Sequence, residues 1–198
     1  DGGWVERWVD VDDVAVGAVL KDNVEGGALP VRHLLNLGGT RLAVVTGPQR
    51  VRTARDRLVG AHQAAAERGV SLDPDLIIEG NFKESGGYQA ARILFSRPNP
   101  PTAIFAQNDM MALGVLRYLE EAGIRVPDEV ALIGFDDIAF AALSRPALTT
   151  IAQPKYEMGR LAAQLLVERL ADSQQAPRRL VLQPRLVLRQ TTVVHREA

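Results

Sequence analysis

Polar side chains directly follow two apolar stretches of this sequence. Asn108 follows residues 102–106, and Asp136 and Asp137 follow residues 130–135. If these stretches are buried parallel strands, their carboxyl ends meet at one edge of an open sheet, where ligands bind. Amide and carboxylate groups at that edge could exchange hydrogen bonds with the hydroxyl groups of a ligand.

An arginine and an aromatic ring are expected at the same edge. Arg57 lies early in a helical stretch that follows another strand end, and Phe82 lies in the loop after residues 76–78. Sugar hydroxyls both donate and accept hydrogen bonds, and the apolar face of a sugar ring stacks on an aromatic ring. The set therefore predicts binding of a sugar-like ligand, although each residue taken alone could equally be a solvated surface group.

The two carboxylates after residues 130–135 have a structural alternative. One of them could cap the following helix instead of binding a ligand. A short helix is expected over residues 138–144, and the residues alone leave open which of the two acids caps it.

The sequence shows no catalytic constellation. It lacks the Gly-x-Gly-x-x-Gly and Gly-x-x-x-x-Gly-Lys-Ser/Thr nucleotide fingerprints and the Gly-x-Ser-x-Gly elbow of hydrolases. His33, His62 and His195 are too scattered for a metal cluster, and the chain has no cysteine. We expect binding without chemistry, with no cofactor and no metal ion.

The composition is that of an ordinary globular protein. The 198 residues are 46% hydrophobic and carry a formal charge of −1. These residues therefore have no basic excess that would indicate binding to nucleic acid. No apolar run approaches the roughly 20 residues of a membrane-spanning helix, so we expect no membrane association.

Short apolar stretches alternate with helical patterns up to Asp137. We expect strands at 41–46, 76–78, 102–106 and 130–135, and helices at 23–37, 53–68, 88–95 and 109–122. Helices of this length between short unbroken apolar strands predict right-handed βαβ crossovers. The expected fold class is α/β with a parallel sheet.

The pattern changes after Asp137. Residues 148–153 are expected to be extended, and residues 157–171 to form an amphipathic helix. Its apolar stripe contains Met158, Leu161, Ala162, Leu165, Leu166 and Leu170. In the tail, Leu180, Leu182, Leu186 and Leu188 alternate with polar residues, which predicts an edge strand or hairpin with one wet face.

Several segments resemble the effector-binding core of the lactose/galactose-repressor family of bacterial transcription regulators. The resemblance covers nearly the whole chain in order, with matching spacings. The clearest segments are Asp109-Met-Met-Ala-Leu-Gly, Gly123-Ile-Arg-Val-Pro-Asp-Glu-Val-Ala-Leu-Ile-Gly-Phe-Asp-Asp, Leu148-Thr-Thr-Ile-Ala-Gln-Pro and Ala54-Arg-Asp-Arg-Leu-Val-Gly.

The resemblance implies a periplasmic-binding-protein-like fold of two Rossmann-like lobes with parallel sheets. The C-terminal lobe would comprise residues 22–151 and 180–194. The N-terminal lobe would comprise residues 1–21 and 154–179 and would be incomplete in this chain. A helix-turn-helix headpiece is absent from these residues and would precede Asp1.

The resemblance also implies a ligand site and a homodimer. Arg57, Asn108 and Asp136 would hydrogen-bond the effector, and Phe82 would stack on it. Gln153 would lie at a crossover and Thr53 at the rim, and Glu6 or Arg7 would reach the cleft from the first lobe. With Asp136 as the ligand acceptor, Asp137 would cap the short helix over residues 138–144. The helix that begins at Asp109, including Met110 and Leu113, would contact the partner subunit. Met110, Met111, Leu113, Val115, Leu116 and Leu119 make this helix apolar around more of its circumference than one face on a sheet requires.

These inferences indicate the effector-sensing domain of a cytoplasmic, dimeric bacterial transcription regulator. A sugar or sugar derivative would bind between the lobes and change operator binding by the headpiece. The alternative is an extracytoplasmic sugar-binding protein of a transport system, which shares the lobes. A helix-turn-helix or a signal peptide in the preceding sequence would discriminate between the two. An enzyme on a doubly wound sheet is disfavoured because no catalytic constellation is present.

Overall fold

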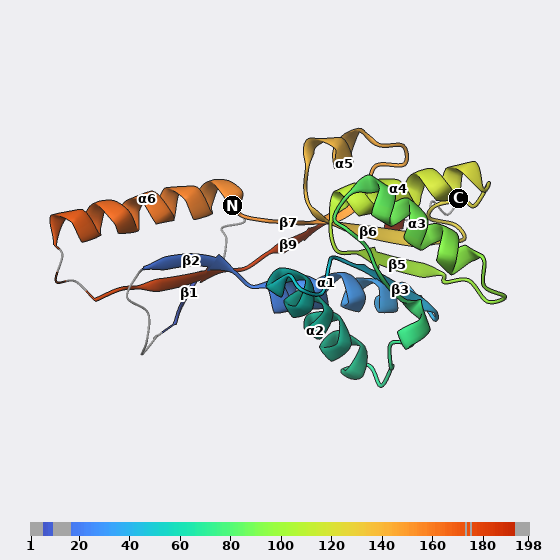
Figure 1. Cartoon of the computed structure of the whole chain (residues 1–198), viewed down its shortest axis with the longest axis horizontal. Coiled ribbons are helices and arrows are strands. Elements are labelled where there is room, and N and C mark those ends of the chain that lie inside the picture. The colour runs from blue at the N-terminus through green and yellow to red at the C-terminus, as the bar shows by residue number, and fades with distance from the viewer. Residues whose placement is uncertain (1–5, 10–16, 173, 175, 193–198) are drawn as a thin grey trace. The chain divides into compact units, whose positions relative to one another are not determined.

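The chain divides into two compact units, whose helices and strands are drawn in Figure 1. The computed structural model describes residues 6–9, 17–172, 174 and 176–192, with the backbone alone for residues 6–9. The larger unit comprises Asn23–Ala152 and Arg185–Ala198, and the smaller unit comprises Asp1–Asp22 and Gln153–Pro184.

A mainly parallel sheet forms the centre of the larger unit. Its strands lie in the order β4-β3-β5-β6-β7-β9, and every neighbouring pair is parallel except β7 with β9. The strands β3, β5 and β7 are buried along their whole length, as expected for apolar stretches without alternation. The bounds are β3 (Leu42–Thr46), β4 (Ile77–Glu79), β5 (Ala103–Ala106), β6 (Ala131–Asp136), β7 (Thr149–Ala152) and β9 (Arg185–Val187).

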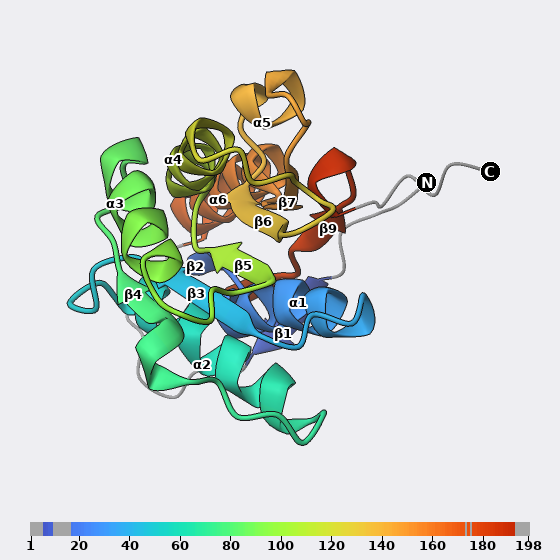
Figure 2. The ribbon, with the colours of Figure 1, turned by 90° about the vertical axis from the view of Figure 1, so that its right-hand side faces the viewer.

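Two pairs of helices cover this sheet. Helices α1 (Asn23–Asn36) and α2 (Arg52–Ala66) pack on one face, and α3 (Glu84–Phe95) and α4 (Asp109–Glu121) pack on the other (Figure 2). In β3, β4, β5 and β6, successive apolar side chains enter opposite cores. Short helices complete the unit, namely α5 (Ala139–Leu143) and 3-10 turns at Pro74–Leu76 and Gln190–Thr192. The predicted α/β fold class is confirmed.

Helix α3 begins at Glu84, earlier than the predicted start at Tyr88. The sequence favoured a loop here because glycine is unfavourable inside a helix. In the structure, a Cβ at Gly87 would overlap the carbonyl oxygen of Met111, and a Cβ at Gly114 would overlap that of Glu84. These glycines let the backbones of α3 and α4 approach closely, so they serve packing between the helices.

The smaller unit contains a three-stranded sheet in which β8 (Arg179–Leu182) is central. Strand β1 (Glu6–Val9) pairs with β8 antiparallel, and β2 (Ala18–Lys21) pairs with it parallel. The prediction that residues 180–194 belong wholly to the C-terminal lobe is therefore wrong for β8. Because β9 pairs with β7 of the other sheet, the tail divides between the two units after Pro184.

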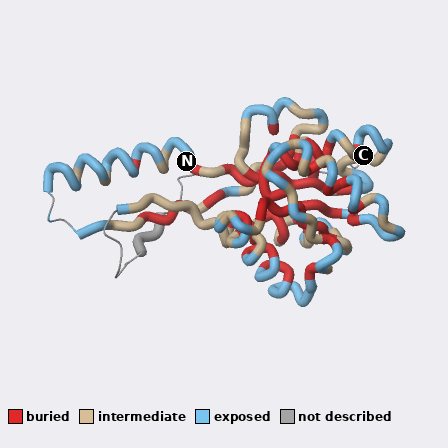
Figure 3. Tube along the Cα trace, in the orientation of Figure 1, coloured by how far each residue is buried: buried red, intermediate tan, exposed pale blue. Residues whose placement is uncertain are grey.

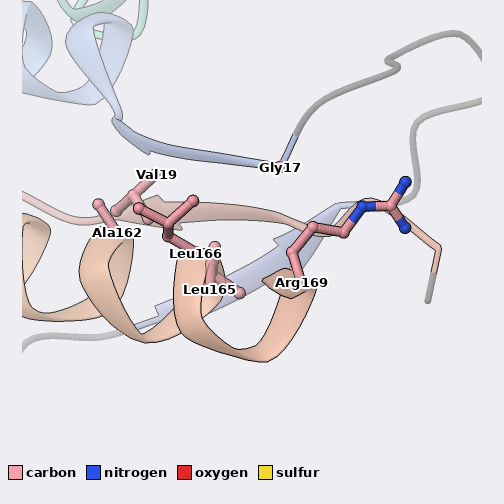
Figure 4. A pocket seen from close by; sticks show the side chains of 6 residues that line it. All are labelled: Gly17, Val19, Ala162, Leu165, Leu166 and Arg169. Carbon is pink, nitrogen blue, oxygen red and sulfur yellow. The ribbon is translucent and has the colours of Figure 1, made fainter. Parts of the chain in front are cut away.

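Helix α6 (Lys155–Ala171) covers the sheet of the smaller unit only thinly. Figure 3 shows α6 mostly in the colour of exposed residues. Within its predicted apolar stripe, Leu161 is buried, whereas Leu166 and Leu170 are 60% and 77% exposed. A pocket of about 130 Å³ lies beside α6, lined by Gly17, Val19, Ala162, Leu165, Leu166 and Arg169 (Figure 4). Its lining is apolar apart from Arg169, so it reflects incomplete packing of helix on sheet. In the described ranges, none of the helices has both the length and the apolar character needed to cross a bilayer.

Candidate ligand-binding site

The predicted ligand residues of the larger unit converge on the carboxyl edge of its sheet. Phe82 lies in the loop after β4, Asn108 follows β5 and Asp136 ends β6, while Arg57 comes from α2. The strands of the first three residues lie close together in the sheet order. A hydrogen bond from Arg57 to the carbonyl oxygen of Gln107, directly after β5, joins Arg57 to the same edge. Residues distant in the sequence are therefore brought together there.

Arg57 is buried at this edge and held in one orientation. It is only 4% exposed. Its guanidinium lies 3.5 Å from the centroid of the Phe135 ring. Nη1 donates to the carbonyl oxygen of Gln107 (2.5 Å), and Nε donates to Oδ1 of Asn23 (3.3 Å). Sequence reasoning missed Phe135 as a platform, because an apolar residue inside a strand gives no sign of what packs on it.

The electrostatics of Arg57 involve two nearby carboxylates. Burial lowers the pKa of Arg57 to about 10, and the negative charges of Asp136 and Asp109 oppose that shift. Arg57 therefore remains a cation at neutral pH. A fixed guanidinium beside carboxylates offers both donors and acceptors to a polar ligand.

Asn108 and Phe82 hold each other in place. Oδ1 of Asn108 accepts from the N–H of Met111 (2.9 Å) and so caps α4, while Nδ2 donates to the carbonyl oxygen of Phe82 (2.8 Å). Phe82 has a φ of 62°. Its ring occupies the space that a Cβ at Gly47 would need. Asn108 thus has a structural role besides its proposed contact with a ligand: it caps α4 and anchors the loop that carries Phe82.

Gln107 is a buried polar residue that sequence reasoning did not single out. It is fully buried. Oε1 accepts from the N–H of Gly47 (2.9 Å), and Nε2 donates to the carbonyl oxygen of Ala54 (3.1 Å). The side chain ties the end of β5 to the loop after β3 and to α2. The only signal in the sequence was a polar residue directly after an apolar stretch, which does not distinguish it from Asn108.

The two carboxylates at the end of β6 have different surroundings. Asp136 and Asp137 both have positive φ, at 120° and 51°. Oδ1 of Asp137 accepts from Nη2 of Arg189 (2.7 Å). The prediction that Asp137 caps the next helix is wrong, because the residue preceding α5 is Ile138 and no side chain caps it.

Asp109 is fully buried beneath this edge. Its carboxylate accepts from Oγ1 of Thr150 (2.5 Å) and from the N–H of Ile138 (2.9 Å). Burial raises the pKa of Asp109 to about 6, and these two hydrogen bonds oppose the rise. The sequence showed an acid after a strand, but Thr150 lies 41 residues away, so the pairing was not visible.

The other residues implied by the family resemblance are placed as follows. Thr53 is half-buried in the first turn of α2. Gln153 belongs to the smaller unit, where its Oε1 accepts from Nζ of Lys21. The side chains of Glu6 and Arg7 lie outside the described residues.

The edge of the sheet combines a buried cation, a carboxylate, an amide and an aromatic ring. Such a set recognises hydroxyl groups and the apolar face of a small ring. Among the residues that the structure describes, no group of three or more His, Asp or Glu side chains is placed to hold a metal ion. The arrangement is suited to binding a polar organic ligand.

Comparison with known proteins relates this chain and its fold to transcription regulators. The family model described as periplasmic binding protein-like domain matches residues 31–192. The HTH-type transcriptional repressor PurR of Shigella sonnei is 36% identical over 188 residues, which cover 95% of this chain and 54% of that repressor. The chain thus spans about half the length of the curated relatives it matches.

Solved structures agree with the sequence relatives. A complex of the transcriptional regulator CelR with cellobiose has a TM-score of 0.83 and 37% identity, covering 89% of this chain and 54% of that one. A LacI family transcriptional regulator from Enterococcus faecium with bound ribose has a TM-score of 0.80 and 34% identity, covering 88% of this chain and 65% of that one. This chain therefore belongs to the periplasmic binding protein-like domain family and, within it, to the effector-binding domains of the lactose/galactose-repressor family of transcription regulators.

Proposed function

We propose that this chain binds a sugar or sugar derivative at the carboxyl edge of the larger unit's sheet, as the effector-sensing part of a bacterial transcription regulator. The observation that carries the proposal is the buried guanidinium of Arg57, stacked on Phe135 and bonded to Gln107 beside the charge of Asp136. Because this guanidinium is buried, its remaining N–H donors have little solvent to bond and are suited to binding a ligand.

Each member of the set has a role in recognising hydroxyl groups. A guanidinium has five N–H donors, and the bonds to Asn23 and Gln107 use two of them. Asp136 would accept from ligand hydroxyls, Asn108 would both donate and accept, and Phe82 would stack on the ring. Thr53 at the rim and Gln153 of the smaller unit would add polar contacts.

The charge of the site favours a neutral ligand. Arg57 is faced by the negative charges of Asp136 and Asp109. An anionic ligand such as a sugar phosphate would gain from the guanidinium but would be repelled by the two carboxylates. Two related solved structures hold neutral sugars, cellobiose in one and ribose in the other.

We further propose that the whole protein is a cytoplasmic repressor that reads operator DNA through an N-terminal headpiece outside this chain. Ligand binding would change DNA affinity through a coupling free energy between the two sites. Relatives at 36% identity are repressors, which favours this function over a sugar-binding protein of a transport system. No catalytic role is proposed.

A homodimer is proposed through the outer surface of α4 and α5. There Met110, Phe140 and Leu143 are 40%, 66% and 67% exposed, and Leu113 is partly exposed. The apolar circumference of α4 alone is a weaker argument than the sequence suggested. Met111, Val115, Leu116 and Leu119 are buried within the larger unit.

A thermal-shift screen tests the proposed ligand class. The panel should contain ribose, cellobiose and other neutral sugars, together with sugar phosphates, purine bases and nucleosides. A ligand that binds only the folded state stabilises it by mass action and so raises the melting temperature. At a free concentration one hundred times its dissociation constant, the ligand adds about 2.7 kcal/mol to the free energy of unfolding. A neutral sugar is expected to give the largest shift. A shift confined to purines or phosphates would contradict the proposed class.

A further inference from the structure

The turn that carries Asp136 has an unusual backbone. Asp136 and Asp137 are consecutive residues with φ of 120° and 51°, and residues other than glycine rarely adopt such positive φ values. The backbone must be held in this conformation by its surroundings. The direction of the Asp136 carboxylate depends on this turn, because the residue ends β6 and its side chain leaves from the turn itself.

The carboxylate of Asp109 holds both amides that follow Asp136. Its Oδ2 accepts directly from the N–H of Ile138 (2.9 Å). Its Oδ1 accepts from Oγ1 of Thr150 (2.5 Å), and the same Oγ1 accepts from the N–H of Asp137 (3.4 Å). One buried acid therefore fixes two successive backbone amides, one directly and one through a hydroxyl group.

The surroundings of Asp109 are shaped around this carboxylate. Asp109 and Thr150 are both fully buried. A Cβ at Gly134 would overlap Oδ1 of Asp109, so the glycine of β6 makes the space that the carboxylate fills. Because Asp109 is enclosed, it acts on a ligand only through other residues.

The neighbouring acid of the turn is engaged elsewhere. Asp137 accepts from Arg189, whose backbone N–H in turn donates to Oγ1 of Thr149 (2.9 Å) and whose Nη1 donates to the carbonyl oxygen of Leu148 (3.0 Å). The two acids of the turn are thus separated by function: Asp137 anchors the turn to the tail, and the charge of Asp136 acts on Arg57.

We propose that Asp109 is a positioning residue for ligand binding: its buried carboxylate, through the amide of Ile138 and the hydroxyl of Thr150, sets the turn that presents Asp136. We call the hydrogen bonds that link Asp109, Thr150 and the amides of Asp137 and Ile138 the clamp. The clamp does not depend on a bound ligand. Its consequence for affinity rests on the proposed function, so the experiment has one arm for each.

The first arm measures amide hydrogen exchange by NMR in the ligand-free protein. In Asp109→Asn, one of the two carboxylate oxygens that accept from Thr150 and Ile138 becomes an NH2 group, which can only donate, so the side chain can no longer accept from both donors in this arrangement. Exchange at Asp137 and Ile138 is expected to accelerate roughly tenfold, relative to the amide of Val45 in the core strand β3. Unchanged exchange at both amides, or equal acceleration at Val45, would overturn the proposal.

Thr150 supplies a matched pair of variants for the relay. Thr150→Val removes the hydroxyl while keeping the side-chain shape, and it is expected to accelerate exchange at Asp137 more than at Ile138. Thr150→Ser keeps the hydroxyl and should restore protection at Asp137. If valine and serine give the same exchange at Asp137, the relay through the hydroxyl is wrong.

The second arm titrates ribose and cellobiose by calorimetry. Asp109→Asn is expected to weaken binding roughly tenfold, whereas Asp75→Asn, at an exposed acid in the turn before β4, leaves it unchanged. Equal affinity of Asp109→Asn and the wild type would overturn the link between the clamp and the ligand. If no neutral sugar of the thermal-shift panel binds the wild type, the proposed ligand class fails, while the exchange measurement still decides the clamp.

Discussion

At the scale of single residues, Asp109 differs from a surface acid because its carboxylate is fully buried. Its pKa is raised from 3.8 to about 6, with burial as the largest cause. The folded state therefore binds a proton more tightly than the unfolded state. Stability from this group is greatest at low pH and is lost as pH rises from about 4 to about 6.

A first prediction follows from this sign. Lowering the pH from 7 to 5 should increase the contribution of Asp109 to the free energy of unfolding by about 1 kcal/mol. Asp109→Asn lacks the titrating group and should lose this increment. Urea unfolding of both proteins at the two pH values gives the difference. An identical pH dependence in the variant and the wild type would contradict the assigned pKa shift.

Residue types indicated the site, but the roles of individual residues depended on contacts over long sequence distances. Asp136 was a candidate because it ends a strand, and Arg57 because its helix follows a strand end. That they bind a ligand stays a prediction. Asp137 was misassigned because its partner Arg189 lies in the tail, 52 residues away. The direction of a side chain in a left-handed turn cannot be obtained from local pattern.

At the scale of elements, periodicity predicted most strands and helices of the larger unit. It failed where packing between helices overrides local propensity. Gly86 and Gly87 resemble a loop in the sequence, yet they lie inside α3 because Gly87 contacts the backbone of α4. The tail strand β8 was misassigned because strand pairing is non-local.

A matched pair of glycine substitutions tests this account of helix packing. Gly87→Ala should destabilise the larger unit by about 2 kcal/mol, because its Cβ would overlap the Met111 carbonyl. Gly159→Ala lies inside α6 with no atom within 4 Å of the added Cβ. It should stabilise that helix by roughly 0.5–1 kcal/mol. Chemical denaturation measures both, and a neutral Gly87→Ala would contradict the close approach of α3 and α4.

At the scale of the whole molecule, the two units differ in how completely their sheets are covered. Helices cover both faces of the larger sheet, whereas α6 buries little more than Leu161 on the smaller one. The family model and the solved relatives span both units of this chain. The candidate site lies on the larger unit, whose sheet has a hydrophobic core on each face.

The proposed dimer gives a prediction at this scale. Met110→Glu together with Phe140→Glu places charges on the exposed surface of α4 and α5 and should convert a dimer to a monomer in analytical ultracentrifugation. Val59→Glu is the control, because Val59 is similarly exposed, at 47%, on a helix that packs on the opposite face of the sheet. A double variant that remains dimeric, or a monomeric wild type, would contradict the proposed surface.

The central claim is that Asp136, beside the fixed guanidinium of Arg57, binds the hydroxyl groups of a sugar. Calorimetric titration of the sugar with the largest thermal shift into the wild type, Asp136→Asn and Asp75→Asn tests it most directly. Asp75 is a control because its side chain is 79% exposed in the turn before β4. Losing a charged acceptor should weaken binding by about 1.5–3 kcal/mol in Asp136→Asn, with no change in Asp75→Asn. Equal affinity in all three proteins would contradict the account.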